Sequence, residues 1–249
     1  MAKLNSSARH TWRLLPLLFT TLCLASVFSR ADDTTRFVEI TEKTLRTTRA
    51  NLATNLNDTA WHYARALFER AEFATNSTQR ADLANDGVIL CRRLVTAQPK
   101  NVGRHFYLGM NLGQLARTKM FGAIPLVDEM EGAFEKARAL DEKFESAGPD
   151  RNLGLLYLEA PRWPISVGNQ MKTRKHLVSA VELAPDFPEN RLNLLDALLR
   201  WGDEKAVAEQ REALAKLLPA ARKQLTGDAW ASSWADWEKR WQRSGPPSK

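Results

Sequence analysis

The strongest constraint on the fold is the regular spacing of related patterns along the chain. The pairs Leu108-Gly109 and Leu153-Gly154 lie 45 residues apart. The turns at Pro99, Glu142 and Pro185 are separated by 43 residues each. A unit repeated at this length buries its apolar face only against a neighbouring copy. The chain is therefore expected to stack its units into a solenoid that presents an extended binding surface.

The repeated units are predicted to be helical hairpins. From about Thr34 onward, apolar residues recur at helical spacing, and no run alternates strictly enough to indicate a strand. Within each unit we expect a Leu-Gly pair to open the first helix, where the glycine lets the second helix approach closely. Small residues such as Ala137 and Ala180 are expected at the helix contacts. The sequence thus predicts an all-α fold.

This pattern resembles the tetratricopeptide repeat, which has Leu-Gly and Tyr on its first helix and Ala, an aromatic and a final Pro on its second. Weaker copies cover Ala60–Asn101 and Asn190–Pro219. The spacing exceeds the usual length of about 34 residues and overlaps the range of about 40–47 that is typical of HEAT and armadillo repeats. The Leu-Gly and Ala-Pro signals favour a tetratricopeptide-like solenoid. Its extra residues are expected in the connections Arg117–Asp128 and Glu159–Gly168.

The N-terminus has the three parts of a secretory signal, which predicts that residues 1–31 direct export to the periplasm and are removed after Ala31. Its apolar run, Leu14–Phe28, is shorter than the roughly 20 residues of a membrane span. We therefore expect no integral span in the mature protein, with an uncleaved anchor as the alternative. Lipid attachment at Cys23 is not expected, because Leu22 stands where lipoprotein signals have a small residue.

Composition and motifs argue against several functional classes. With 44% hydrophobic and 26% charged residues, the chain is typical of a folded protein. The formal net charge of the chain is +7, and removal of the leader with its four cations leaves +3 for the mature chain. No nucleic acid partner is therefore expected. The histidines His62, His105 and His176 are isolated, and the sequence lacks HExxH, CxxC and Gly-rich phosphate motifs. A non-enzymatic protein without metal or cofactor is predicted.

The connection after Glu159 is the most unusual segment. It places Arg162 and Trp163 between Pro161 and Pro164, which limit backbone freedom. One interpretation is that Trp163 fills the apolar groove of the hairpin while Arg162 is solvated. The other is that both residues form a preorganised ligand contact.

The segments Gly148–Tyr157, Ala160–Pro164 and Leu183–Asn190 are similar to the T-component of TRAP transporters. Members of that family are exported bacterial proteins built from irregular tetratricopeptide-like hairpins. They are thought to associate with the periplasmic solute-binding subunit of the importer, and some self-associate. The resemblance implies an accessory subunit with the solute-binding protein as its partner and a homo-oligomer as a further option.

Two functions remain open from the sequence. The first is the accessory subunit, with binding near Arg151, Tyr157, Arg162 and Trp163. The second is a generic exported scaffold, in which a groove near His105, Tyr107 and Asn111 holds an extended peptide or an envelope protein.

The C-terminal segment predicts a capping helix. Over residues 226–243 four tryptophans follow at intervals of 4, 3 and 4, which places them on one helix face. Such a stripe favours a helix that closes the open end of the repeat domain, residues 32–225, while a partner contact and a membrane-interface contact are alternatives. Residues 244–249 are expected to form a disordered tail. The tryptophans are Trp230, Trp234, Trp237 and Trp241.

Overall fold

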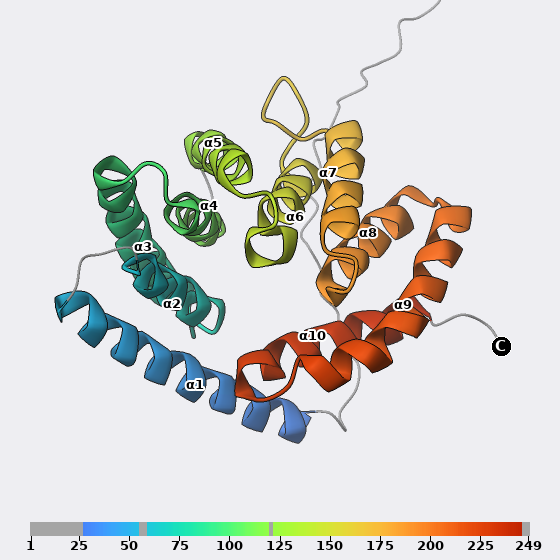
Figure 1. The fold of residues 1–249 in the computed structure, drawn as a ribbon, viewed down its shortest axis with the longest axis horizontal. Helices are drawn as coiled ribbons and strands as arrows, with labels where there is room; N and C mark the ends of the chain where they lie inside the picture. Colours follow the sequence, from blue (N-terminus) through green and yellow to red (C-terminus); the bar gives the residue numbers. More distant parts are fainter. Residues whose placement is uncertain (1–26, 55–58, 120–121, 246–249) are drawn as a thin grey trace, which may run out of the picture.

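The computed structural model describes residues 27–54, 59–119 and 122–245. Within these ranges every regular element is an α-helix (Figure 1), and the one isolated β-bridge, between Arg162 and Gly168, lies in a loop. The all-α prediction is confirmed. The helices are α1 (Val27–Thr54), α2 (Trp61–Glu72), α3 (Ser77–Ala97), α4 (Val102–Ala116), α5 (Ile124–Leu140), α6 (Phe144–Glu159), α7 (Gln170–Leu183), α8 (Pro188–Trp201), α9 (Glu204–Gln224) and α10 (Asp228–Ser244).

The helices from α2 to α9 form four consecutive hairpins: α2 with α3, α4 with α5, α6 with α7, and α8 with α9. The first helices of successive hairpins also contact one another, α2 with α4, α4 with α6, and α6 with α8. The second helices, α3, α5, α7 and α9, make no such backbone contacts with one another among the described residues. The stack therefore curves with its first helices on the inner side (Figure 1), which confirms the tetratricopeptide-like solenoid.

Glycine determines how closely the helices of a hairpin approach. A Cβ atom added to Gly109 would lie 2.5 Å from Cε1 of Phe134, and one added to Gly154 would lie 2.6 Å from Cδ2 of Leu177. Both pairs join a first helix to its second helix, as the Leu-Gly pattern predicted. The pairs lie inside α4 and α6, however, and not at the helix start, and their contacts Phe134 and Leu177 likewise lie inside α5 and α7.

Two predicted boundaries were wrong, and in both cases a proline explains the difference. The first connection was expected to extend to Asp128, but α5 begins at Ile124 with Pro125 in its first turn, where a missing N–H costs no helical hydrogen bond. The last repeat was expected to end at Pro219, but α9 continues through it. Leu214 and Ala221 are buried on either side of that proline, and their packing stabilises the continuous helix.

The tryptophan stripe closes the C-terminal end, as predicted. Trp234 and Trp237 are buried, and Trp230 and Trp241 pack partly buried against the same apolar cluster of α7, α8 and α9. The Trp234 indole N–H also donates to the carbonyl oxygen of Leu225, at 2.6 Å. The capping helix is thus α10.

Helix α1 covers the N-terminal end of the solenoid. It packs on α2, where Phe37 contacts Phe73 and the buried Arg70 pairs with Glu42 at 3.0 Å. The predicted signal lies outside the described residues up to position 26. Across the part of the chain that the structure describes, we find no helix with the length and apolar character needed to traverse a bilayer.

Substituting Gly154 with alanine tests the glycine contact. The added methyl would overlap Leu177, so we expect Gly154→Ala to lower the free energy of unfolding by about 1–3 kcal/mol. Gly132→Ala is the matched control, because its Cβ would meet no atom within 4 Å and alanine favours the helix by up to about 1 kcal/mol. Chemical denaturation of both variants measures the difference, and equal stabilities would contradict the packing role.

Truncation of the most buried indole tests the cap. Trp237 is 1% exposed, and Trp237→Ala should therefore destabilise the protein by about 3–5 kcal/mol. Thermal unfolding followed by circular dichroism would show a lower midpoint. An unchanged midpoint would mean that α10 contributes nothing to the solenoid.

Candidate partner-binding surface

The inner side of the solenoid is largely closed by the protein itself. Helices α1 and α10 run across the open side of the arc and meet (Figure 1), where Arg36 pairs with Asp228 at 2.5 Å. A cavity of about 490 Å³ lies at this junction. The Arg222 guanidinium beside it stacks on Trp234 and pairs with Glu238, so its charge is already satisfied within the chain.

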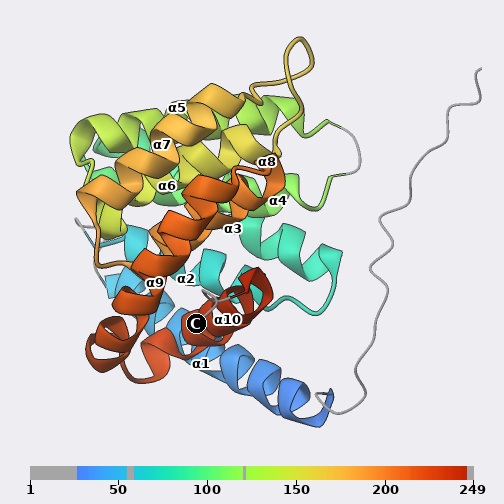
Figure 2. The same cartoon turned by 90° about the vertical axis from the view of Figure 1, so that its right-hand side faces the viewer.

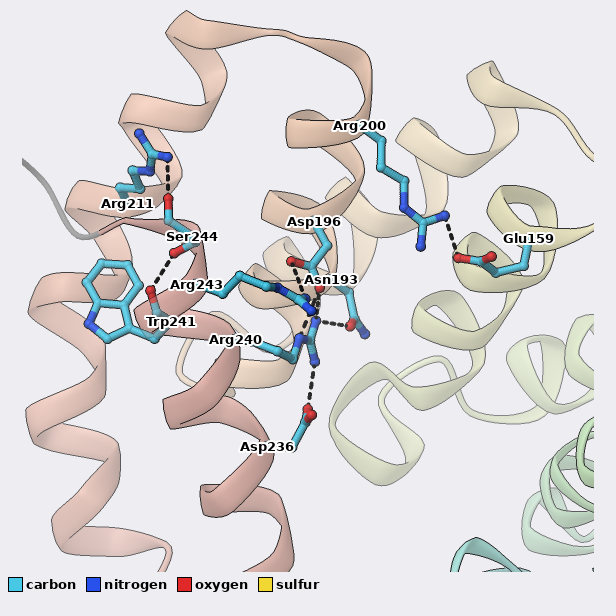
Figure 3. A network of polar contacts seen from close by, with 10 residues as sticks. All are labelled: Glu159, Asn193, Asp196, Arg200, Arg211, Asp236, Arg240, Trp241, Arg243 and Ser244. Carbon is cyan, nitrogen blue, oxygen red and sulfur yellow. Dashed lines mark hydrogen bonds and ion pairs between the residues drawn. The ribbon is translucent and has the colours of Figure 1, made fainter. Parts of the chain in front are cut away.

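Polar side chains of α6, α8 and the capping helix α10 bind one another. Figure 3 shows Arg240 of α10 between Asp196 and Asn193 of α8, at 3.0 and 2.5 Å, and Arg200 of α8 paired with Glu159 of α6 at 2.6 Å. These contacts fix neighbouring helices relative to each other. They leave few of these polar groups available for a ligand.

The sequence-predicted residues His105 and Asn111 lie buried in α4. His105 Nε2 is 2.8 Å from the Pro99 carbonyl oxygen. The Asn111 amide donates to the carbonyl oxygens of Ala64 and Tyr107, at 3.0 and 2.8 Å. Both side chains therefore connect elements of the solenoid.

Tyr107, also predicted as a ligand contact, is buried between α2 and the start of α6. Its ring stacks on Trp61, and its hydroxyl donates to Glu145 Oε1 at 3.0 Å. Burial, opposed by the nearby Arg65 charge and reinforced by Glu145, raises the pKa of the Tyr107 hydroxyl well above its ordinary value. The phenol therefore stays neutral and structural near neutral pH.

Arg151 stabilises an unusual turn at the start of α6. Residues 145–147 have positive φ angles between 48° and 61°, a left-handed conformation that non-glycine residues rarely adopt. The Arg151 guanidinium donates to the carbonyl oxygens of Glu145 and Ser146 and to Asn190 Oδ1, at 3.1, 2.9 and 3.0 Å. Because it satisfies three acceptors inside the chain, its observed role is to hold this turn.

Tyr157 belongs to a polar cluster formed by α5, α6 and α7. Its hydroxyl donates to Glu131 Oε1 at 2.5 Å, and Lys172 pairs with the same carboxylate at 3.2 Å. Burial and the Glu131 hydrogen bond raise the pKa of Tyr157. Two turns away along α6, the fully buried Asp150 accepts hydrogen bonds from Arg138 and His176, at 2.8 and 2.6 Å.

The remaining two predicted residues, Arg162 and Trp163, lie on the protruding α6–α7 loop (Figure 2). Trp163 is 85% exposed, so it does not fill the groove of the hairpin. Ile165 is 62% exposed, and Met171 in the first turn of α7 is 81% exposed. We call residues 160–169 together with Met171 the loop surface.

The base of the loop surface is fixed by backbone hydrogen bonds. Gly168 N–H donates to the Pro161 carbonyl oxygen and Asn169 N–H to that of Tyr157, both at 2.9 Å. A Cβ atom on Gly168 would lie 2.1 Å from the Ala160 carbonyl oxygen, so only glycine allows this closure. The Asn169 side chain then caps α7 by accepting from the N–H of Lys172. The exposed side chains are therefore presented from a defined backbone.

Sequence reasoning missed Ile165 and Met171 as members of this surface. For Met171 a signal was present: Thr173, Leu177 and Ala180 are the buried positions of α7, and Met171 falls outside that face. For Ile165, in an irregular loop, no periodicity was available.

The lone cysteine of the repeat domain is not a candidate nucleophile. Cys91 is buried in α3, and burial, partly offset by Arg104, raises the pKa of its thiol to about 12. A thiol that stays protonated near neutral pH is a poor nucleophile.

Comparison with known proteins supports the fold. No protein-family model and no curated protein matches the chain. Among solved structures, the chain is similar to TTC0263, a thermophilic TPR protein from Thermus thermophilus, with a TM-score of 0.59 and 18% identity. The match covers 86% of this chain and 97% of that one. At this identity the likeness concerns the helical-hairpin solenoid alone.

The Asp150 cluster gives a pH-dependent prediction. Burial raises the pKa of the Asp150 carboxyl, but hydrogen bonds from His176 and Arg138 outweigh this, and the folded-state pKa is lowered. Its stabilisation is therefore present above the unfolded value of about 3.9 and is lost as the pH falls below it. We expect Asp150→Asn to cost about 1.5–3 kcal/mol at pH 7.

Urea denaturation of wild type and Asp150→Asn between pH 3 and pH 7 checks this. The stability difference should shrink as the pH falls from about 5 towards 3. A difference that stays the same at pH 3 would show that the charge of Asp150 is not responsible.

Proposed function

We propose that this protein is a non-enzymatic scaffold that binds another protein through the loop surface. The observation that carries the proposal is the exposure of Trp163, Ile165 and Met171 next to a braced backbone. Large apolar side chains at such exposure are costly to leave in water and are typical anchors of protein interfaces. The fixed base lowers the conformational entropy lost on binding.

The more specific proposal is an accessory component of a TRAP-type solute importer, located in the periplasm. Its support is the sequence resemblance over Gly148–Tyr157, Ala160–Pro164 and Leu183–Asn190, together with the signal-like N-terminus. The partner would be the solute-binding subunit. Self-association of the chain is compatible with the same surface.

The alternative, a groove that holds an extended peptide near His105, Tyr107 and Asn111, has less support. All three side chains are buried, and their polar atoms bind within the chain. Helices α1 and α10 also cover the ends of the inner side. The loop surface is thus the better candidate contact.

Affinity capture from an envelope extract of the source cells tests the proposal. Wild-type protein should retain a solute-binding protein, and Trp163→Ala should weaken the interaction at least about 30-fold, as for a central aromatic anchor. Ile89→Ala is the matched control, because Ile89 is 48% exposed on α3, outside the loop surface. Circular dichroism should show intact helices in both variants.

Three results would count against parts of the proposal. Recovery of no solute-binding protein would remove the transporter role. Equal binding by Trp163→Ala and wild type would remove the loop surface as the contact. Turnover of a substrate by the purified protein would remove the non-enzymatic assignment.

A further inference from the structure

Both long connections within hairpins lie on one edge of the solenoid. The described residues of the α4–α5 connection are 117–119 and 122–123, and the α6–α7 connection covers residues 160–169. Each joins a first helix to its second helix, and Figure 2 shows the two leaving the same edge. We call this edge, with the first residues of α5 and α7, the loop edge.

The charged residues of the two connections and of the first residues of α5 and α7 are all cations. Neither residues 117–125 nor residues 160–175 include an aspartate or a glutamate. A patch of one sign on a chain that is otherwise mixed in charge attracts an oppositely charged surface. The cations in these two segments are Arg117, Lys119, Arg162, Lys172, Arg174 and Lys175.

Half of these cations are neutralised by acids on neighbouring helices. Arg117 pairs with Glu72, Lys172 with Glu131, and Arg174 with Asp203. The remaining three form no ion pair with any of the residues that the structure describes: they are Lys119, Arg162 and Lys175.

The acids bordering the edge do not cancel this charge. Glu159 is already paired with Arg200, at 2.6 Å. Asp128, one turn into α5, is the other acid that borders the two segments in sequence. The two segments and the acids that border them in sequence thus include three cations without an ion pair and one such carboxylate, Asp128, among the residues that the structure describes.

The opposite edge has a different character. It is formed by the turns between hairpins, at residues 98–101, 141–143 and 184–187. These turns contain Lys100 and Lys143 against Asp141, Glu142 and Asp186. The excess of positive charge is therefore a local property of the loop edge.

Charged and apolar exposed groups lie next to each other at the loop edge. Lys175 follows Met171 by four residues, which places both on one face of α7. Arg162 directly precedes Trp163 in the braced loop. An apolar centre with a charged rim is the usual arrangement of a specific protein interface.

We infer that the partner surface is acidic, an inference that rests on the proposed function. An apolar recess of the partner receives Trp163 and Ile165, and carboxylates around that recess face Arg162 and Lys175. Charges on such a rim mainly set the association rate and the salt dependence of binding. A bilayer of anionic lipids would satisfy the same charges. The braced loop favours a folded protein partner, because it holds Trp163 and Ile165 in one geometry, which lowers the entropy lost on docking to a surface of complementary shape.

Photo-crosslinking in the source cell envelope tests the inference. A p-benzoylphenylalanine replaces Ile165, whose exposure allows the larger ring, in the otherwise wild-type chain. The charge-reversal variant adds Arg162→Glu and Lys175→Glu. The matched control instead adds Lys100→Glu and Lys143→Glu, an equal change of net charge on the opposite edge. Circular dichroism of each protein confirms that it is folded.

The expected result is a crosslink to one protein, mapped by mass spectrometry to a segment rich in aspartate and glutamate. Charge reversal on the loop edge should lower the yield at least about tenfold, as expected for two rim ion pairs, while the control stays within about twofold. Raising the salt concentration should lower the wild-type yield and raise the charge-reversal yield, because salt also screens the repulsion between the introduced glutamates and the carboxylates of the partner.

The contrary outcomes separate the inference from the proposed function. A protein crosslink that charge reversal leaves unaltered would overturn the acidic partner and keep the loop surface as a protein contact. Crosslinks to lipid alone, with flotation on phosphatidylglycerol vesicles that charge reversal abolishes, would replace the protein by a membrane. The absence of any crosslink would overturn both.

Discussion

The close contact between the two helices of each hairpin is the constraint on which the rest of the structure depends. Gly109 faces the Phe134 ring and Gly154 faces Leu177, and in each case the space for a side chain on the first helix is taken by the second. Because each hairpin buries its apolar face only on the next, the stack needs a closing element at each end. Helices α1 and α10 supply these, and in doing so they cover the ends of the inner side.

Several polar residues of this protein are buried and hold the helices together instead of being available to a ligand. Arg151, Asn190 and Asp150 are buried, and each satisfies partners on other elements, including a left-handed turn whose carbonyl oxygens would otherwise be orphaned. The side chains that we propose for recognition, Trp163, Ile165 and Met171, are exposed and lie outside the apolar core of the hairpins. They gather on the loop edge, where the connections are longer than a hairpin requires.

Sequence patterns predicted the candidate site only in part. They identified the loop that carries Arg162 and Trp163, because two prolines around a large aromatic are unusual in a helical repeat. They also selected Tyr107, Asn111 and Tyr157, polar or aromatic residues that are equally typical of a binding groove and of a helix interface. Only burial and hydrogen bonding distinguish those two environments, and neither is encoded in residue type.

The sequence by itself determined the helical class, the repeat spacing, the glycine contacts and the tryptophan cap, because periodicity and steric size act locally and recur at fixed intervals. Tertiary structure alone decided which polar residues are exposed and which cations of the two long connections lack a partner. These properties depend on distances between segments far apart in the chain. Glu72 and Arg117, or Asp203 and Arg174, become partners only when the hairpins stack.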